Sequence, residues 1–334
     1  MNGIRNRETW LDNVRTVACL MVIIVHVTVL YKSRYGSVDN VYWYLTVFLD
    51  SASRMCVPLF FMVSGYIFLS DKSVRAKNAL KIFTALTFYS VIGVLYYVFF
   101  TGGNFTNLII TLYSKPEMYH LWFMFYLFTF YIIFCLIRVR ELNPNVALII
   151  IVLLFTVFNY KLNDISSLFG FEIKNGFYIR ADYFHLFLYT VAGAYIARIE
   201  DNRTFFLFAF IVMIASVAGI TLLTIVKSEM VGKFDAVFQT YTSVPVFFSA
   251  VSMFYVIRYS KLHGKFASCS KLISKNSLAI YGIHAVILEI IRSRKLFLSE
   301  NPAINMLFTY IIVFGFSLVL AVAIKKIDRK GFVS

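Results

Sequence analysis

The sequence is poor in charged residues and in residues that interrupt secondary structure. Only 15% of its 334 residues are charged, and it contains 5 prolines and 15 glycines. A water-soluble domain has about a quarter of its residues charged, so this composition excludes an ordinary soluble surface. The scarcity of proline and glycine, together with 36 phenylalanines and 22 tyrosines, excludes a disordered or low-complexity chain.

Cysteine is also scarce. The four cysteines are Cys19, Cys56, Cys135 and Cys269, and no two of them form a Cys-x-x-Cys pair. The absence of such pairs excludes the common zinc and redox motifs. We therefore interpret the cysteines as packing residues rather than as disulfide partners or metal ligands.

Apolar residues are abundant. They make up 60% of the chain, and its mean hydropathy is +0.76. A membrane-spanning helix needs about 20 such residues in a row. The segments that approach this length lie at about 14–31, 41–69, 79–101, 119–138, 146–160, 177–197, 205–226, 236–257, 276–291 and 304–324. The sequence therefore predicts an all-α, polytopic transmembrane helix bundle of about ten helices, forming a single domain over residues 1–334, with a kink in the long second span near Pro58.

Positive charge predicts the orientation of these helices in the membrane. The net charge of +15 is distributed in short clusters between the apolar segments, which favours topology signals over nucleic-acid binding. With the N-terminus inside, the inner segments hold roughly twice as many Lys and Arg residues as the outer loops, so we expect both termini in the cytoplasm. No cleavage pattern follows the first apolar run, which we expect to be a retained span rather than a signal peptide.

The most basic inner segment is the loop 258–275, which includes Arg258, Lys261 and His263. Two interpretations remain open for it. The loop is either a topology signal in contact with anionic membrane lipids or a site for a phosphate-bearing ligand.

The first span carries a candidate catalytic pair. Arg15 and His26 are 11 residues apart, so on a helix they point in roughly the same direction, about 16 Å apart along the axis. A histidine with little access to water favours its neutral form, and a neutral imidazole is a competent general base for a hydroxyl. Asp12, one turn before Arg15, is expected to hold the guanidinium or to cap the helix. A purely structural His26, satisfied by a neighbouring helix, remains the alternative.

The second span contains Arg54 near its middle. A charge at the bilayer centre costs at least about 2.5–3.5 kcal/mol on insertion scales, so we expect Arg54 to face a polar cavity or a carboxylate. Pro58 frees a backbone carbonyl close to it. Ser64 and Gly65 follow in the same span, and small residues there are also compatible with simple close packing of helices.

Further ionisable and aromatic residues lie in later spans. The fourth span opens with Tyr119, His120 and Trp122, which are also typical of an interfacial aromatic belt. The sixth carries Asp182 and His185, and the ninth carries Tyr281, His284 and Glu289. Their spacing predicts no metal site. The residues alone leave two classes open, an enzyme with its site in a membrane cavity and a transporter with a proton relay.

Several of these motifs resemble the acyltransferase-3 family of membrane acyltransferases. The resemblance rests on Arg15-x10-His26 and on the segment from Arg54 through Val-Pro-Leu-Phe-Phe-Met-Val-Ser64-Gly65-Tyr66. It extends to Trp10-Leu-Asp12-Asn-Val-Arg15, Tyr119-His120-Leu-Trp122-Phe, Ile280-Tyr281-Gly-Ile-His284-Ala and the tail Ile327-Asp328-Arg329…Val333-Ser334. It covers nearly the whole chain.

The resemblance implies an O-acetyltransferase in the bacterial inner membrane. Such an enzyme moves an acetyl group from cytoplasmic acetyl-CoA, a substrate rather than a resident cofactor, to a hydroxyl of a surface polysaccharide or of its lipid-linked precursor. The resemblance maps the family's arginine and histidine pair onto Arg15 and His26, and its second-span arginine onto Arg54. With a donor that enters from the inside, we expect Arg15 to bind its phosphates and His26 to be the base or acyl carrier. Arg54 is the candidate for stabilising the oxyanion, with Ser64 a lesser one. The expected substrate-binding residues are Asp12, Ser64, His120, Trp122 and His284.

Overall fold

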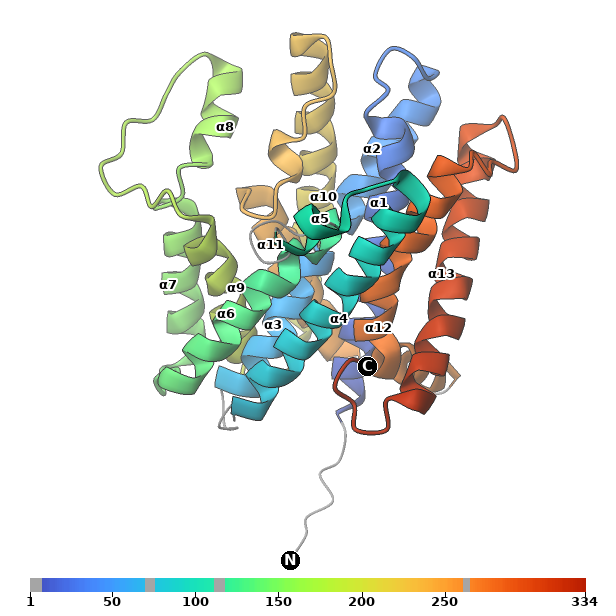
Figure 1. Ribbon diagram of the computed structural model, residues 1–334. Helices are drawn as coiled ribbons and strands as arrows, with labels where there is room; N and C mark the ends of the chain where they lie inside the picture. Colours follow the sequence, from blue (N-terminus) through green and yellow to red (C-terminus); the bar gives the residue numbers. More distant parts are fainter. Residues whose placement is uncertain (1–7, 70–75, 111–117, 261–264) are drawn as a thin grey trace, which may run out of the picture. The chain divides into compact units, whose positions relative to one another are not determined.

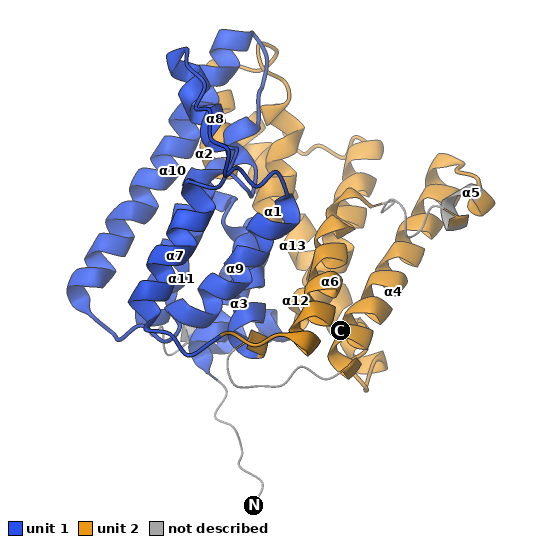
Figure 2. Cartoon of the chain, turned by 90° about the vertical axis from the view of Figure 1, so that its left-hand side faces the viewer, with its two compact units in different colours: residues 1–21, 51–67, 140–275 blue, residues 22–50, 68–139, 276–334 orange. Residues whose placement is uncertain are grey.

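The computed structural model describes residues 8–69, 76–110, 118–260 and 265–334, and helices carry most of them (Figure 1). Within these ranges a single isolated β-bridge joins Asn159 and Ile179. The predicted all-α helix bundle is confirmed. The chain divides into two compact units, shown in different colours in Figure 2. Unit 1 comprises residues 1–21, 51–67 and 140–275, and unit 2 comprises residues 22–50, 68–139 and 276–334.

Unit 1 contains the first half of α1 (Thr9–Lys32), most of α3 (Cys56–Leu69) and helices from the middle of the chain. The latter are α7 (Pro144–Thr156), α8 (Leu162–Ser166), α9 (Asp182–Ile196), α10 (Arg203–Val231), α11 (Val244–Ser260) and the start of α12 (Lys265–Ser293). Helix α10 packs along α11, and α9 packs against both α7 and α11. Phe155 of α7 stacks on Phe247 of α11 with ring centroids 4.0 Å apart, and Tyr189 of α9 contacts both rings. This aromatic core holds the three helices together.

Unit 2 contains the second half of α1, most of α2 (Asn40–Ser53) and the remainder of α12. It also contains α4 (Ala76–Thr101), α5 (Phe105–Ile110), α6 (Trp122–Leu136) and α13 (Pro302–Ile327). A short 3₁₀ turn, Tyr119–Leu121, leads into α6, and α4 packs against both the turn and α6.

Seven helical stretches among the described residues are long and apolar enough to cross a membrane. They are Thr9–Lys32, Asn40–Leu69, Ala76–Thr101, Tyr119–Leu136, Arg203–Val231, Val237–Ser260 and Pro302–Ile327. Each corresponds to a predicted span. The other three predicted spans fall on α7, with 13 residues, on α9, with 15, and within the more polar α12. The total of about ten spans and the cytoplasmic termini stay predictions.

Side-chain caps explain where the long helices begin. The Asn202 side chain accepts hydrogen bonds from the Thr204 and Phe205 N–H groups at the start of α10. Asn301 caps α13 in the same way, and a proline occupies its first turn. Helix α10 ends at Gly232, whose φ of 68° is in the left-handed region that glycine adopts without strain.

The predicted long second span is broken in two. Arg54 and Met55 form a turn between α2 and α3. Pro58, in the first turn of α3, has no N–H to donate to the Arg54 carbonyl four residues earlier. The helical hydrogen bonds resume with the Leu59 N–H, which donates to the Met55 carbonyl at 3.0 Å. The break therefore lies one turn before the proline, and Arg54 is placed in irregular backbone rather than within a helix.

A buried ion pair joins α1 to α2 within unit 2. Lys32 Nζ donates to Asp50 Oδ1 at 2.7 Å, and Thr28 Oγ1 donates to the same oxygen at 3.0 Å. Both charged residues are buried. The charge pattern alone places Lys32 in the outer loop after the first span; the structure corrects this, because Lys32 is the last residue of α1 and its ammonium is paired with the buried Asp50. Asp50, an acidic residue inside a predicted span, is the sequence feature that indicates a buried cationic partner for it.

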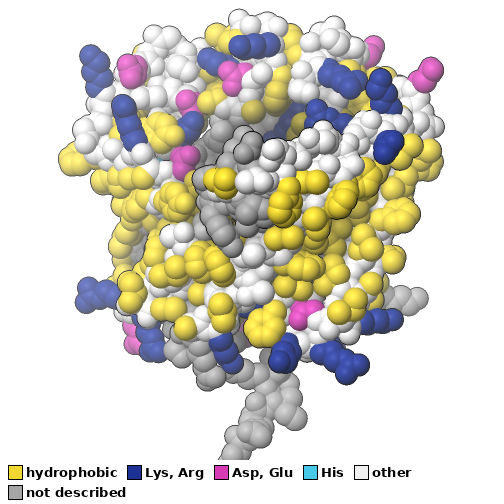
Figure 3. Space-filling view, in the orientation of Figure 1, with side chains coloured by type: hydrophobic (Ala, Val, Ile, Leu, Met, Phe, Trp, Pro, Cys, Tyr) yellow, Lys and Arg dark blue, Asp and Glu magenta, His cyan; other side chains and the backbone are white. Residues whose placement is uncertain are grey.

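The surface matches a multi-pass membrane protein. On the face shown in Figure 3, hydrophobic side chains fill a broad band, and most Lys and Arg side chains gather above and below it. Large apolar side chains are exposed along α10 and α13, including Ile211, Leu222, Phe316 and Val319. The hydrocarbon core of a bilayer covers such apolar surfaces, whereas their exposure to water is unfavourable.

Candidate active site

Three histidines from separate elements come together in unit 2. His26 lies on α1, His120 in the turn before α6, and His284 on α12. The centroid of the His284 ring lies 5.0 Å from that of His26 and 4.9 Å from that of His120, and the remaining pair is 6.3 Å apart. We call these three residues the histidine cluster. The sequence named all three residues, and the structure brings them into one place.

The members of the histidine cluster differ in exposure. His284 and His120 are 0% and 1% exposed, whereas His26 is half-buried. Tyr119 is 43% exposed and its ring centroid lies 5.1 Å from that of His26. His26 is therefore the histidine at the accessible edge of the cluster, with the other two imidazoles buried behind it.

Hydrogen bonding fixes the tautomer of His284. Its Nδ1 lies 2.7 Å from the Tyr281 carbonyl oxygen and 3.3 Å from that of Ile280. A carbonyl only accepts, so Nδ1 must carry the hydrogen, and Nε2 of the neutral ring carries a lone pair. This Nε2 is buried and has no hydrogen-bond partner among the described residues. The cluster thus contains a buried nitrogen base whose orientation is set by the backbone of its own helix.

Close packing of α12 on its neighbours holds the cluster in place. The Tyr281 hydroxyl donates to the His120 carbonyl, and the Tyr281 ring contacts the rings of both His120 and Phe123. A Cβ at Gly282 would overlap the ring of Tyr89 on α4. A glycine is therefore required where α12 passes α4, and this close approach positions Tyr281 and His284.

The predicted donor-side residues Asp12 and Arg15 lie in unit 1. Helix α1 begins at Thr9, so the alternative that Asp12 caps this helix is wrong; Asp12 lies in the first turn. Its buried carboxylate accepts a hydrogen bond from the Ser274 hydroxyl at 2.7 Å and lies 4.0 Å from the Arg15 guanidinium. Arg15 keeps 28% of its side chain exposed. An oriented, accessible guanidinium of this kind is suited to binding an anion.

Arg54, in the break between α2 and α3, also lies in unit 1. Its guanidinium carbon is 5.7 Å from the centroid of the Tyr241 ring. The Tyr241 hydroxyl lies 3.8 Å from Cys56 Sγ, and the Tyr241 carbonyl accepts a hydrogen bond from Tyr189 at 2.8 Å. Arg54 is half-buried. An aromatic ring face is thus one partner of this mid-span charge, which the sequence expected to face a polar cavity or a carboxylate.

Ser64 lies beside a close helix crossing in unit 1. A Cβ on Gly65 of α3 would overlap the Thr190 carbonyl of α9, and a Cβ on Gly193 of α9 would overlap the Met62 carbonyl of α3. The two helices therefore touch backbone to backbone at paired glycines. This matches the close-packing interpretation of the Ser64-Gly65 pair, and a substrate-binding role for Ser64 stays a prediction.

Trp122 and His185 both lie against aromatic rings. Trp122 begins α6, is half-buried, and contacts the rings of Phe123 and Tyr126, an aromatic setting that matches the interfacial-belt alternative. His185 is buried in unit 1, where its Nδ1 lies 3.0 Å from the Ala181 carbonyl and its ring contacts Phe155. No group of ligating side chains suited to a metal ion occurs in the part of the chain that the structure describes.

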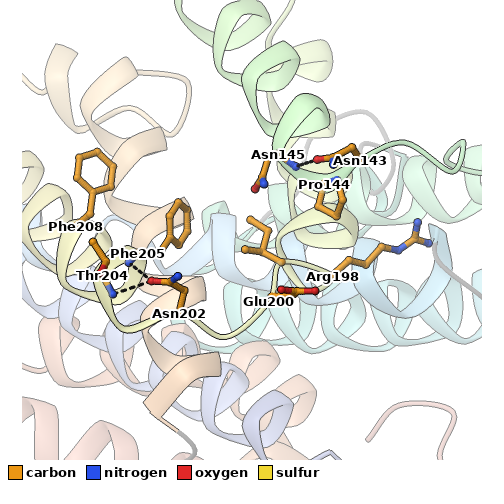
Figure 4. A pocket seen from close by; sticks show the side chains of 10 residues that line it. Asn143, Pro144, Asn145, Arg198, Glu200, Asn202, Thr204, Phe205 and Phe208 are labelled. Carbon is orange, nitrogen blue, oxygen red and sulfur yellow. Dashed lines mark hydrogen bonds between the residues drawn. The ribbon is translucent and has the colours of Figure 1, made fainter.

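A polar pocket of about 740 Å³ lies in unit 1 at the start of α7 and of α10 (Figure 4). Arg198 and Glu200 line it, together with Asn202 and the rings of Phe205 and Phe208. No histidine lines this pocket, so it is distinct from the histidine cluster. Nearby, Arg258 of the basic segment pairs with Asp201 at 3.1 Å, whereas Lys261 and His263 lie outside the described residues.

Comparison with known proteins identifies the family. A model of an acyltransferase domain matches residues 8–326, which is almost the whole chain and includes residues of both units. The chain belongs to the acyltransferase-3 family. Membership makes the protein a membrane acyltransferase and favours the enzyme over the transporter that the residues alone left open. Comparisons with curated proteins and with solved structures found no match.

Proposed function

We propose that this acyltransferase is an O-acetyltransferase of the bacterial inner membrane. It transfers the acetyl group of cytoplasmic acetyl-CoA to a hydroxyl of a surface polysaccharide or of its lipid-linked precursor. The observation that carries the proposal is the histidine cluster, in which an accessible imidazole is backed by a buried base of defined tautomer. Proton transfer from a hydroxyl is the chemistry that such a group performs.

His26 acts as the general base in this proposal. It accepts the proton of the acceptor hydroxyl while the hydroxyl oxygen forms a bond to the thioester carbonyl carbon. The tetrahedral oxyanion then collapses, the carbon–sulfur bond breaks, and the sulfur takes the proton from the His26 imidazolium to leave as the free thiol of CoA. Atoms, charge and electrons balance without a further reactant.

His284 is a positioning residue in this proposal. The ring centroids of His284 and His26 are 5.0 Å apart. The lone pair of His284 Nε2 therefore stabilises the positive charge that forms on His26 when His26 takes the proton. Because the Nδ1–H is held by the Tyr281 carbonyl, the ring does not need to reorient during the reaction. His120 is buried next to His284, with ring centroids 4.9 Å apart, and excludes water from the cluster.

The identity of the acceptor rests on the sequence motifs. They resemble those of the O-acetyltransferase of enterobacterial common antigen, so a polysaccharide of that class is the first acceptor to test. The predicted roles of Arg15 in donor binding and of Arg54 in oxyanion stabilisation stay predictions.

The direct test is transfer of labelled acetyl. Purified protein is incubated with labelled acetyl-CoA and with surface glycan from cells that lack the protein, and label in the glycan is counted. We expect transfer by the wild type, none by His26→Gln, and nearly wild-type transfer by His185→Gln, which alters a buried histidine outside the cluster. Thermal melting shows whether the variants are folded. A folded His26→Gln protein that transfers acetyl at the wild-type rate would falsify the catalytic assignment.

A further inference from the structure

Two pockets of different chemistry lie along one stripe of α1, both within unit 2. The first, of about 470 Å³, lies where α1 ends, beside the second half of the loop between α12 and α13 and the start of α13. Its lining includes Tyr31, Arg34, Phe297, Ser299, Glu300 and Asn305. We call it the polar pocket of unit 2. It combines an aromatic ring, hydroxyls, an amide and both signs of charge, which are the groups that orient a hydroxyl-rich ligand.

The charged groups of this pocket are available to a ligand. Neither the Arg34 guanidinium nor the Glu300 carboxylate has an ion-pair or hydrogen-bond partner among the described residues. Asn305 Nδ2 donates to the Tyr31 hydroxyl at 2.6 Å, which leaves the hydroxyl hydrogen of this buried tyrosine free to donate. Asn305 Oδ1 accepts from the Leu298 N–H at 3.1 Å, which ties the loop to α13. These hydrogen bonds hold Tyr31 and Asn305 in place before a ligand arrives, whereas Arg34 and Glu300 are exposed at the pocket.

The second pocket is apolar. It has a volume of about 300 Å³ and is lined by residues of α1, α2 and α13, including Ile24, Val27, Thr28, Ala303, Met306 and Leu307. Leu307 is 58% exposed, so the pocket opens towards the surface that α13 presents to the bilayer. We call it the apolar pocket of unit 2.

Helical spacing places residues of both pockets on one face of α1. Val27 of the apolar pocket and Tyr31 of the polar pocket are four residues apart on α1, so these two positions share one face of the helix, and Arg34 follows two residues after the helix ends at Lys32. The same helix carries His26, and Leu30, one turn after His26, also lines the polar pocket. In the predicted orientation this end of α1 faces outwards, away from the cytoplasmic source of acetyl-CoA.

We propose that the acceptor of the acetyl group is a lipid-linked saccharide, with its saccharide in the polar pocket and its hydrocarbon chain in the apolar pocket. The proposal rests on the proposed function and decides between its two acceptors. A free polysaccharide has no hydrocarbon chain to fill the apolar pocket. An ordinary membrane lipid has no saccharide to bind Arg34 and Glu300 in the polar pocket. An amphiphile that presents a sugar to His26 from the outer side uses both.

The experiment compares an acceptor with and without its chain. The lipid-linked saccharide fraction is extracted with organic solvent from cells that lack the protein, and half of it is freed of the chain by mild acid. Acetyl transfer to each is measured at saturating acetyl-CoA in detergent. We expect the wild type to use the chain-bearing form about 100-fold better in kcat/KM, as expected when one bound part raises the local concentration of the other.

Matched variants separate the two pockets. Ala303→Phe fills the apolar pocket and should remove most of the preference for the chain, whereas Ala323→Phe, at an exposed position elsewhere on α13, should keep it. Arg34→Ala should raise KM for both acceptors about tenfold or more, as expected for loss of a charged hydrogen bond. Arg294→Ala, an exposed arginine nearby in the chain, should leave both values unchanged, and KM for acetyl-CoA should stay the same throughout.

Each part of the proposal has its own failure. Equal use of both acceptors by the wild type, or an unchanged preference in Ala303→Phe, refutes the chain site. An unchanged acceptor KM in Arg34→Ala refutes the saccharide site while leaving the acetyltransferase intact. If the wild type transfers no acetyl to either acceptor, the proposed function fails. Native mass spectrometry then measures binding of the lipid-linked fraction to the wild type and to Ala303→Phe, independently of acetyl transfer. Equal binding to both proteins would refute the proposed pockets.

Discussion

The spacing of the histidine cluster predicts how the enzyme responds to acid. Ring centroids 5.0 Å and 4.9 Å apart place two imidazolium charges within contact distance. At an effective dielectric constant of about 20, two unit charges 5 Å apart repel by roughly 3 kcal/mol. This lowers the affinity for a second proton by a factor of about 100 or more. The cluster should therefore bind one proton, not two or three, across the range in which histidines ordinarily titrate.

The measurement is the pH dependence of acetyl transfer. Initial rates at saturating acetyl-CoA are recorded from about pH 5 to pH 8, where histidine is the side chain that ordinarily changes charge. We expect the logarithm of the rate to rise with pH with a slope of about one and then to level, because a single proton on the cluster removes the base. His284→Gln should keep the slope of one but lower the plateau roughly 10- to 100-fold, as expected for loss of a preorganised polar partner.

His185→Gln, in unit 1, should change neither slope nor plateau. A slope close to two would mean that two imidazoles protonate together, and the compact cluster would have to be abandoned. A plateau in His284→Gln equal to that of the wild type would remove His284 from the mechanism and leave His26 acting alone.

Other predictions concern charged residues outside the cluster. Arg54→Lys should lose at least about tenfold in kcat, because lysine does not reproduce the planar guanidinium over the Tyr241 ring; near-normal turnover would show that charge alone suffices. Arg15→Ala should raise KM for acetyl-CoA before it lowers kcat, and an unchanged KM would remove Arg15 from the donor site. Asp50→Asn leaves the Lys32 ammonium buried without its carboxylate and should lower the free energy of unfolding by about 3–5 kcal/mol, measured as a lower melting temperature in detergent. A melting temperature equal to that of the wild type would show that the pair is solvated.

The sequence predicted the helical architecture because long apolar segments have few alternatives in a bilayer. It named the three histidines but gave no reason to separate them from His185, which has the same residue type and a similar setting in a span. The difference is tertiary. His185 lies in the other unit with Phe155 against its ring, whereas His284 is set beside His26 and His120 by the passage of α12 over α4.

Local chemistry predicted some details and missed others. Pro58 indicated a disruption in the second span, and the missing N–H explains why it appears one turn earlier, at Arg54. The burial of Lys32 was missed because positive charge at the end of a span usually indicates a loop, and only its pairing with Asp50 reverses that expectation. The packing of Gly65 against α9 depends on Gly193, more than a hundred residues away in the chain, and no local pattern predicts such a pairing.

Tyr281 holds two histidines by two different parts of itself. Its carbonyl accepts from His284, and its hydroxyl donates to the His120 carbonyl. The hydrogen bond to His284 uses the main chain of Tyr281, so any substitution that keeps the helix preserves it. The hydrogen bond to the His120 carbonyl uses the phenol oxygen, so removal of that one atom abolishes it. Tyr281→Phe thus removes the hydrogen bond that holds the His120 turn but keeps the one that orients His284. A substitution at this single position can therefore change the packing of His120 without changing the orientation of His284.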